Sequence, residues 1–465
     1  MKDVTIIGSG PAGLFAALEL IRRRPQSRVV IFEKGPDRKT RTEDNLISGL
    51  GGSGAFSDGK LTFPNPKYPR SLEVGGQLVL IIGRERYLQI LRKVNRLYTE
   101  FGGRPDFYEE GKDQKIQELV EKAFNFKLGL IPTKVRHFGS DLSPLIIKNI
   151  REELEKKGVE IFLETAVETI RKDGTTFLLE LSGKQTGFFR TRFVVAAPGR
   201  GGASWLARQA KTLNIEVQPR QTSVDIGIRV ETRSHVLAPL TDYLYDPKIE
   251  FYAKPFENKT RTFCVCPYGS VIVEKYQNLF TTVNGHSLFE KHLSKNTNFA
   301  MLVSVNFTEP FDEPLKYGGR VSELANMLGG KVLVQRLGDL RAGRRSNPEK
   351  INRGLVEPTL KEATPGDLSF ALPYRHLANL LGTLEALDNI APGINGDNTL
   401  LYGNEVKFYS SRVKCSSELE AMRNFFVAGD GAGFTRGLLQ SSASGIVAAE
   451  AILKRMSYWK EGPHE

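Results

Sequence analysis

The sequence predicts an α/β fold in which a discontinuous Rossmann-like domain is interrupted by an inserted mixed α+β domain. The first observation is a β-α-β pattern over residues 1–35, in which a glycine-rich turn leads from an apolar run into a helical pattern. The second is a buried strand, a glycine-rich turn and a helix over residues 425–455. The third is the change to shorter strands and longer loops between about 205 and 415. Similar patterns at both ends indicate one domain completed across an insertion.

The N-terminal turn has the spacing of a dinucleotide-binding motif. It follows the apolar run Val4 to Ile7, and Glu33 stands twenty residues after its last glycine. Gly8 allows the tight turn, Gly10 allows a pyrophosphate to approach the backbone, and Gly13 allows the helix to lie close to the strand. The N–H groups of the helix N-terminus then face the anion. We expect Glu33 to bind an adenosine ribose, which favours FAD or NAD over NADP. The turn reads Gly8-Ser9-Gly10-Pro11-Ala12-Gly13.

The C-terminal motif repeats this anion-binding pattern. A buried strand leads into Gly429 and Asp430, and a helix of small residues starts near Gly437. We expect Asp430 to accept a hydrogen bond from a ribityl or ribose hydroxyl. The helix N-terminus would lie against the pyrimidine end of a flavin and stabilise negative charge there; it comprises Thr435, Arg436 and Gly437. A turn shaped only for packing is the alternative. Two such motifs at opposite ends of the chain favour FAD over NAD.

Between these motifs the pattern predicts the domain boundaries. We assign residues 1–78, 131–204 and 416–465 to an FAD-binding domain, residues 79–130 to a helical insertion, and residues 205–415 to a substrate domain. Within the second part, Ser143 is expected to cap a helix that has Pro144 in its first turn and that ends at Gly158. The loop from Gly51 to Lys60 is rich in small and polar residues, including Asp58, and its composition fits a segment lying flat against a ligand. A flexible surface loop is the alternative.

Length and composition indicate a soluble globular protein of two or three domains. No apolar run of the 465 residues approaches the ~18 that a membrane helix needs. The three cysteines are too few for a disulfide scaffold and favour a reducing compartment. The first strand starts at residue 3, which leaves no room for a cleavable signal peptide. We therefore expect a cytoplasmic protein.

The net charge of +12 allows an anionic partner, such as an acidic small-molecule substrate, an electron-carrier protein, a membrane surface or a nucleic acid. The basic residues are scattered, however, so we expect their short clusters to be solvated faces. These clusters are Arg22-Arg23-Arg24, Arg92-Lys93-Arg96, and Arg341 with Arg344 and Arg345. The scattered charge argues against nucleic acid, and the oligomeric state does not follow from it.

With these motifs, the chain resembles flavoproteins with two dinucleotide-binding domains, the class related to p-hydroxybenzoate hydroxylase. More narrowly, it resembles the uncharacterised FAD-dependent, or NAD/FAD-utilising, dehydrogenases of bacteria and archaea. The narrower resemblance spans nearly the whole chain. Besides the two terminal motifs and the Gly51 loop, it includes Arg136 to Asp141, Asp225 to Glu231, Arg261 to Pro267, Asn284-Gly285 and Tyr402 to Lys407.

The resemblance implies an FAD site and names no substrate. The implied FAD contacts are Gly8, Gly10, Pro11, Ala12, Gly13, Glu33, Lys34, Gly51, Gly52, Ser53, Gly54, Ala55, Ser57, the backbone near Val167, Gly199, Gly429 and Asp430. Two departures matter. Pro198 stands where the broad class has a threonine, so no hydroxyl is available there. Tyr268 stands where the narrow family tends to have glycine, so its side chain would occupy substrate space.

Candidates for chemistry at the flavin are few. Cys264 and Cys266 are two residues apart in an apolar strand, so their side chains are expected on one face. Residues placed in this way are poorly suited to a disulfide, and buried cysteines acting as small apolar residues are the favoured interpretation. His137 and Tyr268 are candidate proton donors, each with a packing role as the alternative, and Lys60 is a fifth candidate. No metal-binding set is apparent.

We expect an FAD-dependent oxidoreductase, either a dehydrogenase or a reductase, that transfers a hydride to or from a C–C or C–N bond of a small organic substrate. NAD(P)H would then bind only transiently, as electron donor or acceptor, because no second fingerprint is present. A flavin monooxygenase uses the same fold and is one alternative. An RNA-modifying flavoprotein and a non-catalytic binding protein are two others.

Arg229, a charge among apolar residues, needs a partner, for which Glu231 or a substrate carboxylate would serve.

Overall fold

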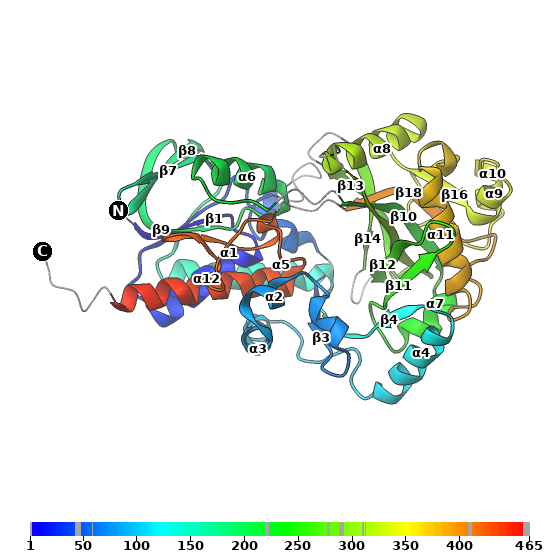
Figure 1. Cartoon of the computed structure of the whole chain (residues 1–465), viewed down its shortest axis with the longest axis horizontal. Helices are drawn as coiled ribbons and strands as arrows, with labels where there is room; N and C mark the ends of the chain where they lie inside the picture. Colours follow the sequence, from blue (N-terminus) through cyan, green and yellow to red (C-terminus); the bar gives the residue numbers. More distant parts are fainter. Residues whose placement is uncertain are drawn as a thin grey trace, which may run out of the picture.

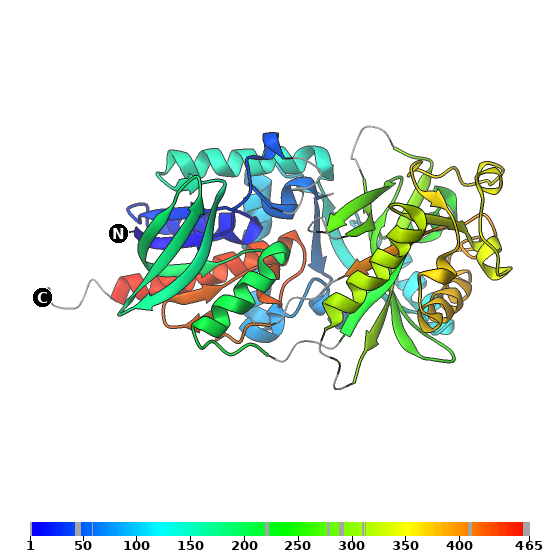
Figure 2. The same cartoon turned by 90° about the horizontal axis from the view of Figure 1, so that it is seen from above.

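The chain forms two lobes that lie side by side (Figures 1 and 2). The structure is a computed structural model that describes residues 2–41, 48–57, 59–218, 223–276, 280–287, 293–308, 311, 313–407 and 412–458. The first lobe contains both ends of the described chain, and the second is formed largely by its middle. Asp58 of the predicted ligand-covering loop lies outside the described residues.

The first lobe is built on a sheet with a parallel centre. Its strands are β1 (Lys2–Ile7), β2 (Val29–Phe32), β6 (Glu160–Phe162), β7 (Thr165–Asp173), β8 (Thr176–Gly183), β9 (Gly187–Ala196), β19 (Glu420–Met422) and β20 (Phe425–Val427). Strands β20, β9, β1, β2 and β6 are parallel, while β19 and the pair β7–β8 extend the sheet antiparallel. Ile7 lies opposite both Phe32 and Ala196, so three strands end together. The turns after these strands therefore share one edge, where open α/β sheets bind ligands.

Helices cover both faces of this sheet. They are α1 (Pro11–Arg23), α2 (Leu78–Ile82), α3 (Arg84–Glu100), α5 (Gly139–Lys156), α6 (Ala203–Thr212) and α12 (Leu438–Tyr458). Helices α1 and α12 lie side by side on one face, and α6 lies on the other, beside β7 and β8 (Figure 1). A Cβ atom at Gly445 would stand 2.0 Å from the carbonyl oxygen of Ala12, so α1 and α12 touch backbone to backbone. The ends of the chain are thereby packed into one core.

The second lobe contains an eight-stranded, mostly antiparallel sheet. In spatial order its strands are β17 (Thr364–Pro365), β16 (Leu333–Arg336), β18 (Leu400–Lys407), β10 (Ser223–Arg233), β15 (Asn296–Asn306), β12 (Asn258–Cys266), β11 (Lys248–Ala253) and β4 (Gly129–Ile131). Around the sheet lie α4 (Asp113–Asn125), α7 (Ser234–Thr241), α8 (Pro314–Gly329), α9 (Leu337–Arg341), α10 (Pro348–Asn352), α11 (Tyr374–Leu387) and the hairpin β13 (Ser270–Tyr276) with β14 (Phe280–His286). Strand β15 is buried along almost its whole length, because elements cover both faces.

Two pairs of segments join the lobes. Strand β3 (Lys60–Pro64) pairs antiparallel with β5 (Thr133–His137) between them. The segments that enter and leave the second lobe pair at Val217 and Val413. The residues predicted as one helical insertion, 79–130, are divided between the lobes: α3 packs in the core of the first, whereas α4 and β4 pack in the core of the second. Their helical pattern is the same, and only the packing partner separates them.

The β-α-β unit, the C-terminal strand and the C-terminal helix appear as predicted, in β1, α1, β2, β20 and α12. The start of helix α5 was predicted wrongly. It begins at Gly139 rather than after Ser143, so Pro144 lies inside it, and Ser143 Oγ donates a hydrogen bond to the Gly139 carbonyl (3.2 Å). Gly139 has a φ of +73° and turns the chain straight from β5 into the helix. The helix ends before Gly158, whose φ is +82°, as the sequence indicated.

Candidate functional site

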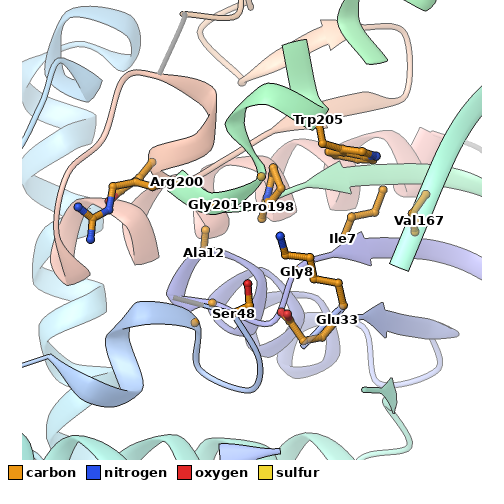
Figure 3. Close-up of a pocket in the computed structure, with 18 of the residues that line it drawn as sticks. Ile7, Gly8, Ala12, Glu33, Ser48, Val167, Pro198, Arg200, Gly201 and Trp205 are labelled. Atoms are coloured by element: carbon orange, nitrogen blue, oxygen red, sulfur yellow. The ribbon is translucent and has the colours of Figure 1, made fainter. Parts of the chain in front are cut away.

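A first cavity of about 390 Å³ lies at the edge of the parallel sheet where the strands end. Figure 3 shows it extending from Val167 at one end to Arg200 at the other. Its lining comes from the turns after β1, β2, β9 and β20, from the start of β7 and from α6. The predicted cofactor residues that line it are Gly8, Gly10, Pro11, Ala12, Glu33, Lys34, Gly52, Ser53, Val167, Gly199, Gly429 and Asp430.

The glycines of the N-terminal turn have different roles. A Cβ atom at Gly8 would stand 2.3 Å from the carbonyl oxygen of Ala197, and one at Gly13 would stand 2.0 Å from that of Gly8. Both glycines are therefore required by packing. At Gly10 the nearest heavy atom would be 4.0 Å away, and at Gly199 nothing lies within 4 Å. These two positions leave open space in front of the backbone, which fits the approach of a dinucleotide.

The N-terminus of α1 supplies the polar groups at this open space. No side chain caps the helix, and its first turn contains no acidic residue. Gly10, Pro11 and Ala12 line the cavity, so the N–H groups of the first turn are available to an anion. This is the donor arrangement that a pyrophosphate requires.

Glu33 lines the cavity, but its carboxylate already holds the surrounding loops. One oxygen accepts hydrogen bonds from the N–H and the hydroxyl of Ser9, and the other accepts from the N–H groups of Gly35 and Gly49, all at 2.9 Å. Four donors match the four acceptor positions of a carboxylate. The Ser9 hydroxyl also lies 3.4 Å from the Gly49 carbonyl oxygen. If the Ser9 hydroxyl donated to the Gly49 carbonyl instead, one acceptor position on the Glu33 carboxylate would become free. Binding of a ribose by Glu33 stays a prediction, and it requires this change of hydrogen-bond partner.

Asp430 lies where the first cavity meets the start of α12. Its Oδ1 accepts a hydrogen bond from Thr435 Oγ1 (2.9 Å), and its carboxylate also accepts one from the Gly437 N–H. Burial raises the pKa of Asp430, although Arg200 and these two donors oppose the shift. The side chain is thus held in place by the same segment that begins the C-terminal helix.

The remaining predicted cofactor residues divide into two groups. Gly13, Gly51, Gly54, Ala55 and Thr435 are packed around the first cavity rather than lining it, whereas Ser57, Arg436 and Gly437 line a second cavity. Gly54 illustrates the packing role, because its Cβ would stand 2.8 Å from Leu438. Sequence reasoning missed Arg200, Ser204, Trp205 and Arg208, which follow β9 and line the first cavity. The signal was the run Arg200-Gly201-Gly202 directly after Gly199.

The second cavity, of about 480 Å³, is lined by both lobes. The first lobe contributes residues of the 57–77 segment and the first turn of α12, and the second lobe contributes β11 and β12. Like α1, helix α12 has no acidic residue in its first turn, and Leu438 and Gln440 from that turn line the cavity. The charged residues that line it are Lys60, Arg70, Glu73, Asp246, Lys248, Glu250, Lys259, Arg261 and Arg436.

Three of the predicted catalytic residues meet at the wall of this cavity. The Lys60 ammonium donates to the Val265 carbonyl oxygen (2.5 Å) and lies 3.7 Å from Cys264 Sγ and 3.8 Å from Cys266 Sγ. Asp246 lies 4.0 Å from the same ammonium, and the Lys60 side chain is only 8% exposed. Burial alone would raise the pKa of Asp246, but Lys248 and Lys60 outweigh it, so this carboxyl is more acidic than usual.

His137 lies beside this group without lining the cavity. Strand pairing places it directly opposite Lys60. Its Nε2 is 3.0 Å from Tyr245 Oη and 3.3 Å from Ser287 Oγ, and its ring stacks on that of Tyr245. Tyr245 and Ser287 are residues that sequence reasoning did not identify. The His137 side chain is therefore held by Tyr245 and Ser287, next to Lys60, which lines the cavity.

Tyr268 lies outside the substrate space that the family resemblance predicted for its side chain. Its side chain is 46% exposed, and it lines neither cavity. It lies in the turn between β12 and β13 with a φ of +53°, and the Tyr268 carbonyl accepts a hydrogen bond from the Ser294 N–H. A turn directs this side chain outward, so it does not occupy the second cavity.

Arg229 is paired inside the protein and is not a substrate contact. Its guanidinium lies 3.1 Å from Glu405, and both side chains are fully buried. Its Nη2 also donates to the Cys264 carbonyl (2.8 Å). Glu231, the partner considered from the sequence, instead accepts hydrogen bonds from Thr359, Tyr402 and Asn296. Glu405 lies on the neighbouring strand β18, opposite Gly227, and no local pattern of the sequence identifies it as the partner of Arg229.

Two general features of the described residues complete the description. None of their helices is long and apolar enough to cross a membrane. Among them, no three or more His, Cys, Asp or Glu side chains are grouped so as to hold a metal ion.

Comparison with known proteins supports the cofactor. Residues 3–44 match a family described as FAD binding domain, and residues 225–408 match a family described as FAD-dependent protein, C-terminal domain-like. A protein of Clostridium beijerinckii, itself described as uncharacterized, is 25% identical over 492 residues, covering 97% of this chain and 80% of that protein.

The solved structures that match this chain are less similar to it in sequence. Glycine oxidase from Geobacillus kaustophilus is 15% identical with a TM-score of 0.40, covering 97% of this chain and 95% of that one. A p-nitrophenol 4-monooxygenase from Pseudomonas putida is 12% identical with a TM-score of 0.40, covering 100% and 82%. The two family matches, one in each lobe, place the chain in the class of FAD-dependent flavoproteins, whose bound flavin carries out oxidation–reduction chemistry.

Proposed function

We propose that this flavoprotein is an oxidoreductase that transfers a hydride to or from a C–C or C–N bond of a small organic substrate in the second cavity. The supporting observation is the junction of the two cavities. Asp430 lines the first, Gly437 lines the second, and the N–H of Gly437 donates a hydrogen bond to the Asp430 carboxylate. The end of the first cavity and the wall of the second are therefore one hydrogen bond apart, which supports a dinucleotide that extends from the first cavity to the second.

The residues that would hold FAD follow from this path. The first turn of α1 and Gly10 would face the pyrophosphate, and Arg200 would add a positive charge at that end. Asp430 would accept a hydrogen bond from a ribityl hydroxyl. The first turn of α12 and Arg436 would face the flavin ring from the second cavity, where their positive potential favours negative charge. FAD supplies the hydride acceptor or donor, and the protein supplies orientation, electrostatics and protons.

The charges of the second cavity are suited to orienting a polar substrate. Six lysine and arginine side chains and three carboxylates line it, so its lining has an excess of positive charge. Lys60 stands out among them because it is almost completely buried, yet its ammonium is held at the cavity wall by the Val265 carbonyl. A buried ammonium next to a reacting centre is able to donate a proton or to hold a developing negative charge. We therefore assign Lys60 this role.

The absorption spectrum of the purified protein is the first test. Flavin bands with about one FAD per chain are expected, and an Asp430→Ala variant should lose most of them. A colourless protein that does not take up added FAD would contradict the proposal.

Electron flow is the second test. NADH or NADPH added without oxygen should bleach the flavin if a nicotinamide is the donor, and a substrate should bleach it if the enzyme works as a dehydrogenase. Oxygen consumption matched by a hydroxylated product would instead identify a monooxygenase. If a panel of small carboxylates, amines and enones gave no bleaching of the flavin and no turnover, this result would argue against hydride transfer in this cavity.

A further inference from the structure

Cys264 and Cys266 lie closer together than their positions in a regular strand would allow. Alternate residues of a strand are about 6.6 Å apart along its axis, since each residue advances about 3.3 Å. Here the two sulfur atoms are 3.9 Å apart. The pairing of β12 with β15 shifts register between Phe263 and Cys266, and Cys264 has a φ of +49°. A bulge at Cys264 therefore turns its thiol towards that of Cys266.

Two buried cations lie beside the thiols, and each also faces a carboxylate: Asp246 is 4.0 Å from the Lys60 ammonium, and Glu405 is 3.1 Å from the Arg229 guanidinium. The Lys60 ammonium lies within 3.8 Å of each sulfur, and a guanidinium nitrogen of Arg229 lies 3.5 Å from Cys266 Sγ. Both cations are buried, so water screens them little. Cysteines that only fill apolar space have no need of two buried cations. Positive charge of this kind favours the thiolate, which is the reactive form of cysteine.

The two thiols differ in access. Cys264 is half-buried and lines the second cavity, whereas Cys266 is fully buried behind it. The hydrogen bond with Cys264, together with burial, raises the pKa of Cys266 well above its usual value. Cys264 is thus placed to meet a molecule in the cavity, and Cys266 is placed to attack the Cys264 sulfur from behind.

We propose that Cys264 and Cys266 form a redox-active dithiol that reduces a small-molecule disulfide in the second cavity. The Cys264 thiolate attacks one sulfur of the disulfide, which forms a mixed disulfide and releases a thiolate. Cys266 gives up its proton and attacks the Cys264 sulfur, which closes an intramolecular disulfide and releases the second thiolate. Each departing thiolate takes up one proton. Overall, two protein thiols and one disulfide become one protein disulfide and two small thiols.

This inference goes beyond the hydride transfer proposed above and does not depend on it. It needs no electron from the flavin, because the disulfide is the oxidant. Thiol counts and peptide masses therefore test it separately from flavin bleaching, so either proposal can fail while the other stands.

The first experiment counts thiols in the holoenzyme after exposure to glutathione disulfide. The number that react with iodoacetamide in denaturant should fall from three to one, and the peptide containing both cysteines should lose the mass of two hydrogens. A Cys266→Ser variant should stop at a glutathione adduct on Cys264. The matched control is Cys415→Ser, which removes the third thiol and should leave the disulfide between Cys264 and Cys266 to form as before. Burial raises the pKa of the Cys415 thiol to about 11. Three reactive thiols after treatment, or an adduct on Cys415 alone, would overturn the proposal.

The second experiment tests the role of Lys60 through the pH dependence of alkylation at Cys264. A Lys60→Met variant should raise the apparent pKa of this reaction by about one unit and slow it about tenfold at pH 7. Lys60→Arg should restore most of the rate, because the charge remains. Lys361→Met removes a surface cation that pairs with Glu357, and it should leave the profile unchanged. An unchanged pH profile in Lys60→Met, with the fold intact by circular dichroism, would show that the lysine does not activate the pair.

Discussion

The two cavities are neighbours, linked by the hydrogen bond from Gly437 to Asp430, but they are built in opposite ways. The first is formed largely by backbone: glycine turns, strand ends and the N-terminus of α1, with Gly10 and Gly199 leaving room at its surface. The second is formed by charged side chains that both lobes contribute. Backbone groups suit a ligand that is the same in every relative, because they do not vary with sequence. Side chains suit a reaction that differs between relatives. If the proposed function holds, the cofactor and the reaction therefore depend on different parts of the chain.

The support beneath the cavities differs in the same way. Under the first, the α1 and α12 backbones touch at Gly445. Under the second, the buried Arg229 and Glu405 hold the bulge that carries Cys264. A backbone contact is lost when a side chain is added, whereas an ion pair is lost when one partner is removed.

Removing one partner of the buried ion pair should be the most damaging change. We expect Arg229→Met to lower the free energy of unfolding by about 3 kcal/mol, because the buried Glu405 would keep only Lys407, 3.0 Å away, as its counter-charge. Denaturant unfolding measures this loss. Arg353→Met is the control, since Arg353 pairs with Glu349 on the surface and both are about three-quarters exposed. If the two variants were equally stable, the Arg229–Glu405 ion pair would not be what stabilises the region under the second cavity.

A buried histidine should make the second lobe sensitive to acid. Burial lowers the pKa of His376 in α11 to about 4, and neither ring nitrogen has a hydrogen-bond partner among the described residues. The unfolded chain binds a proton below about pH 6.5 and the folded chain only below about 4, so stability falls as the pH drops through this window, by up to about 3 kcal/mol. His376→Phe should remove this part of the pH dependence.

The measurement for His376 is the difference in unfolding free energy between the variant and the parent at pH 7.5 and at pH 4.5. Taking the difference cancels Glu109, whose pKa burial raises to about 7 and which acts in the opposite direction. A difference that does not change with pH would mean that His376 titrates normally.

Filling the open space at Gly10 should weaken FAD binding without unfolding the protein. Gly10 has a φ of −71°, which any residue adopts, and its Cβ would meet no atom nearer than 4.0 Å. We therefore expect Gly10→Val to keep the stability of the apoprotein and to lose roughly 2 kcal/mol of FAD binding, about 30-fold, by crowding the ligand. Fluorescence titration with FAD measures this. Thr175→Val, in the exposed turn between β7 and β8, is the control and should bind FAD normally.

Removing the charge of Lys60 should have the complementary effect. We expect Lys60→Met to retain FAD with unchanged affinity and to lower the rate of flavin reduction by substrate about tenfold, equivalent to about 1.4 kcal/mol. Stopped-flow absorbance under anaerobic conditions separates this rate from binding. If Lys60→Met instead lost FAD, the division between a cofactor cavity and a reaction cavity would be wrong.

The parts of the site that could be read from sequence are those encoded over short distances. Gly8, Gly10, Gly13 and Asp430 were found because each belongs to a strand–turn–helix pattern of about fifteen residues, in which spacing alone fixes the backbone path. Arg200 and Trp205 were missed because their turn has no established spacing. The occupied carboxylate of Glu33 was also missed, since its donors come from a loop that only the fold brings back to it.

The cofactor class and the architecture of the first lobe therefore follow from the sequence, because hydrophobic period and glycine spacing act locally. The second cavity, in contrast, depends on the tertiary structure. Lys60 and Cys264 are 204 residues apart, and they meet because β3 lies between the lobes and faces β12. The bulge that brings Cys264 to Cys266, the pairing of Arg229 with Glu405 and the outward position of Tyr268 also depend on the register of neighbouring strands. Contacts of this kind are set by how the whole chain packs, which no local pattern records.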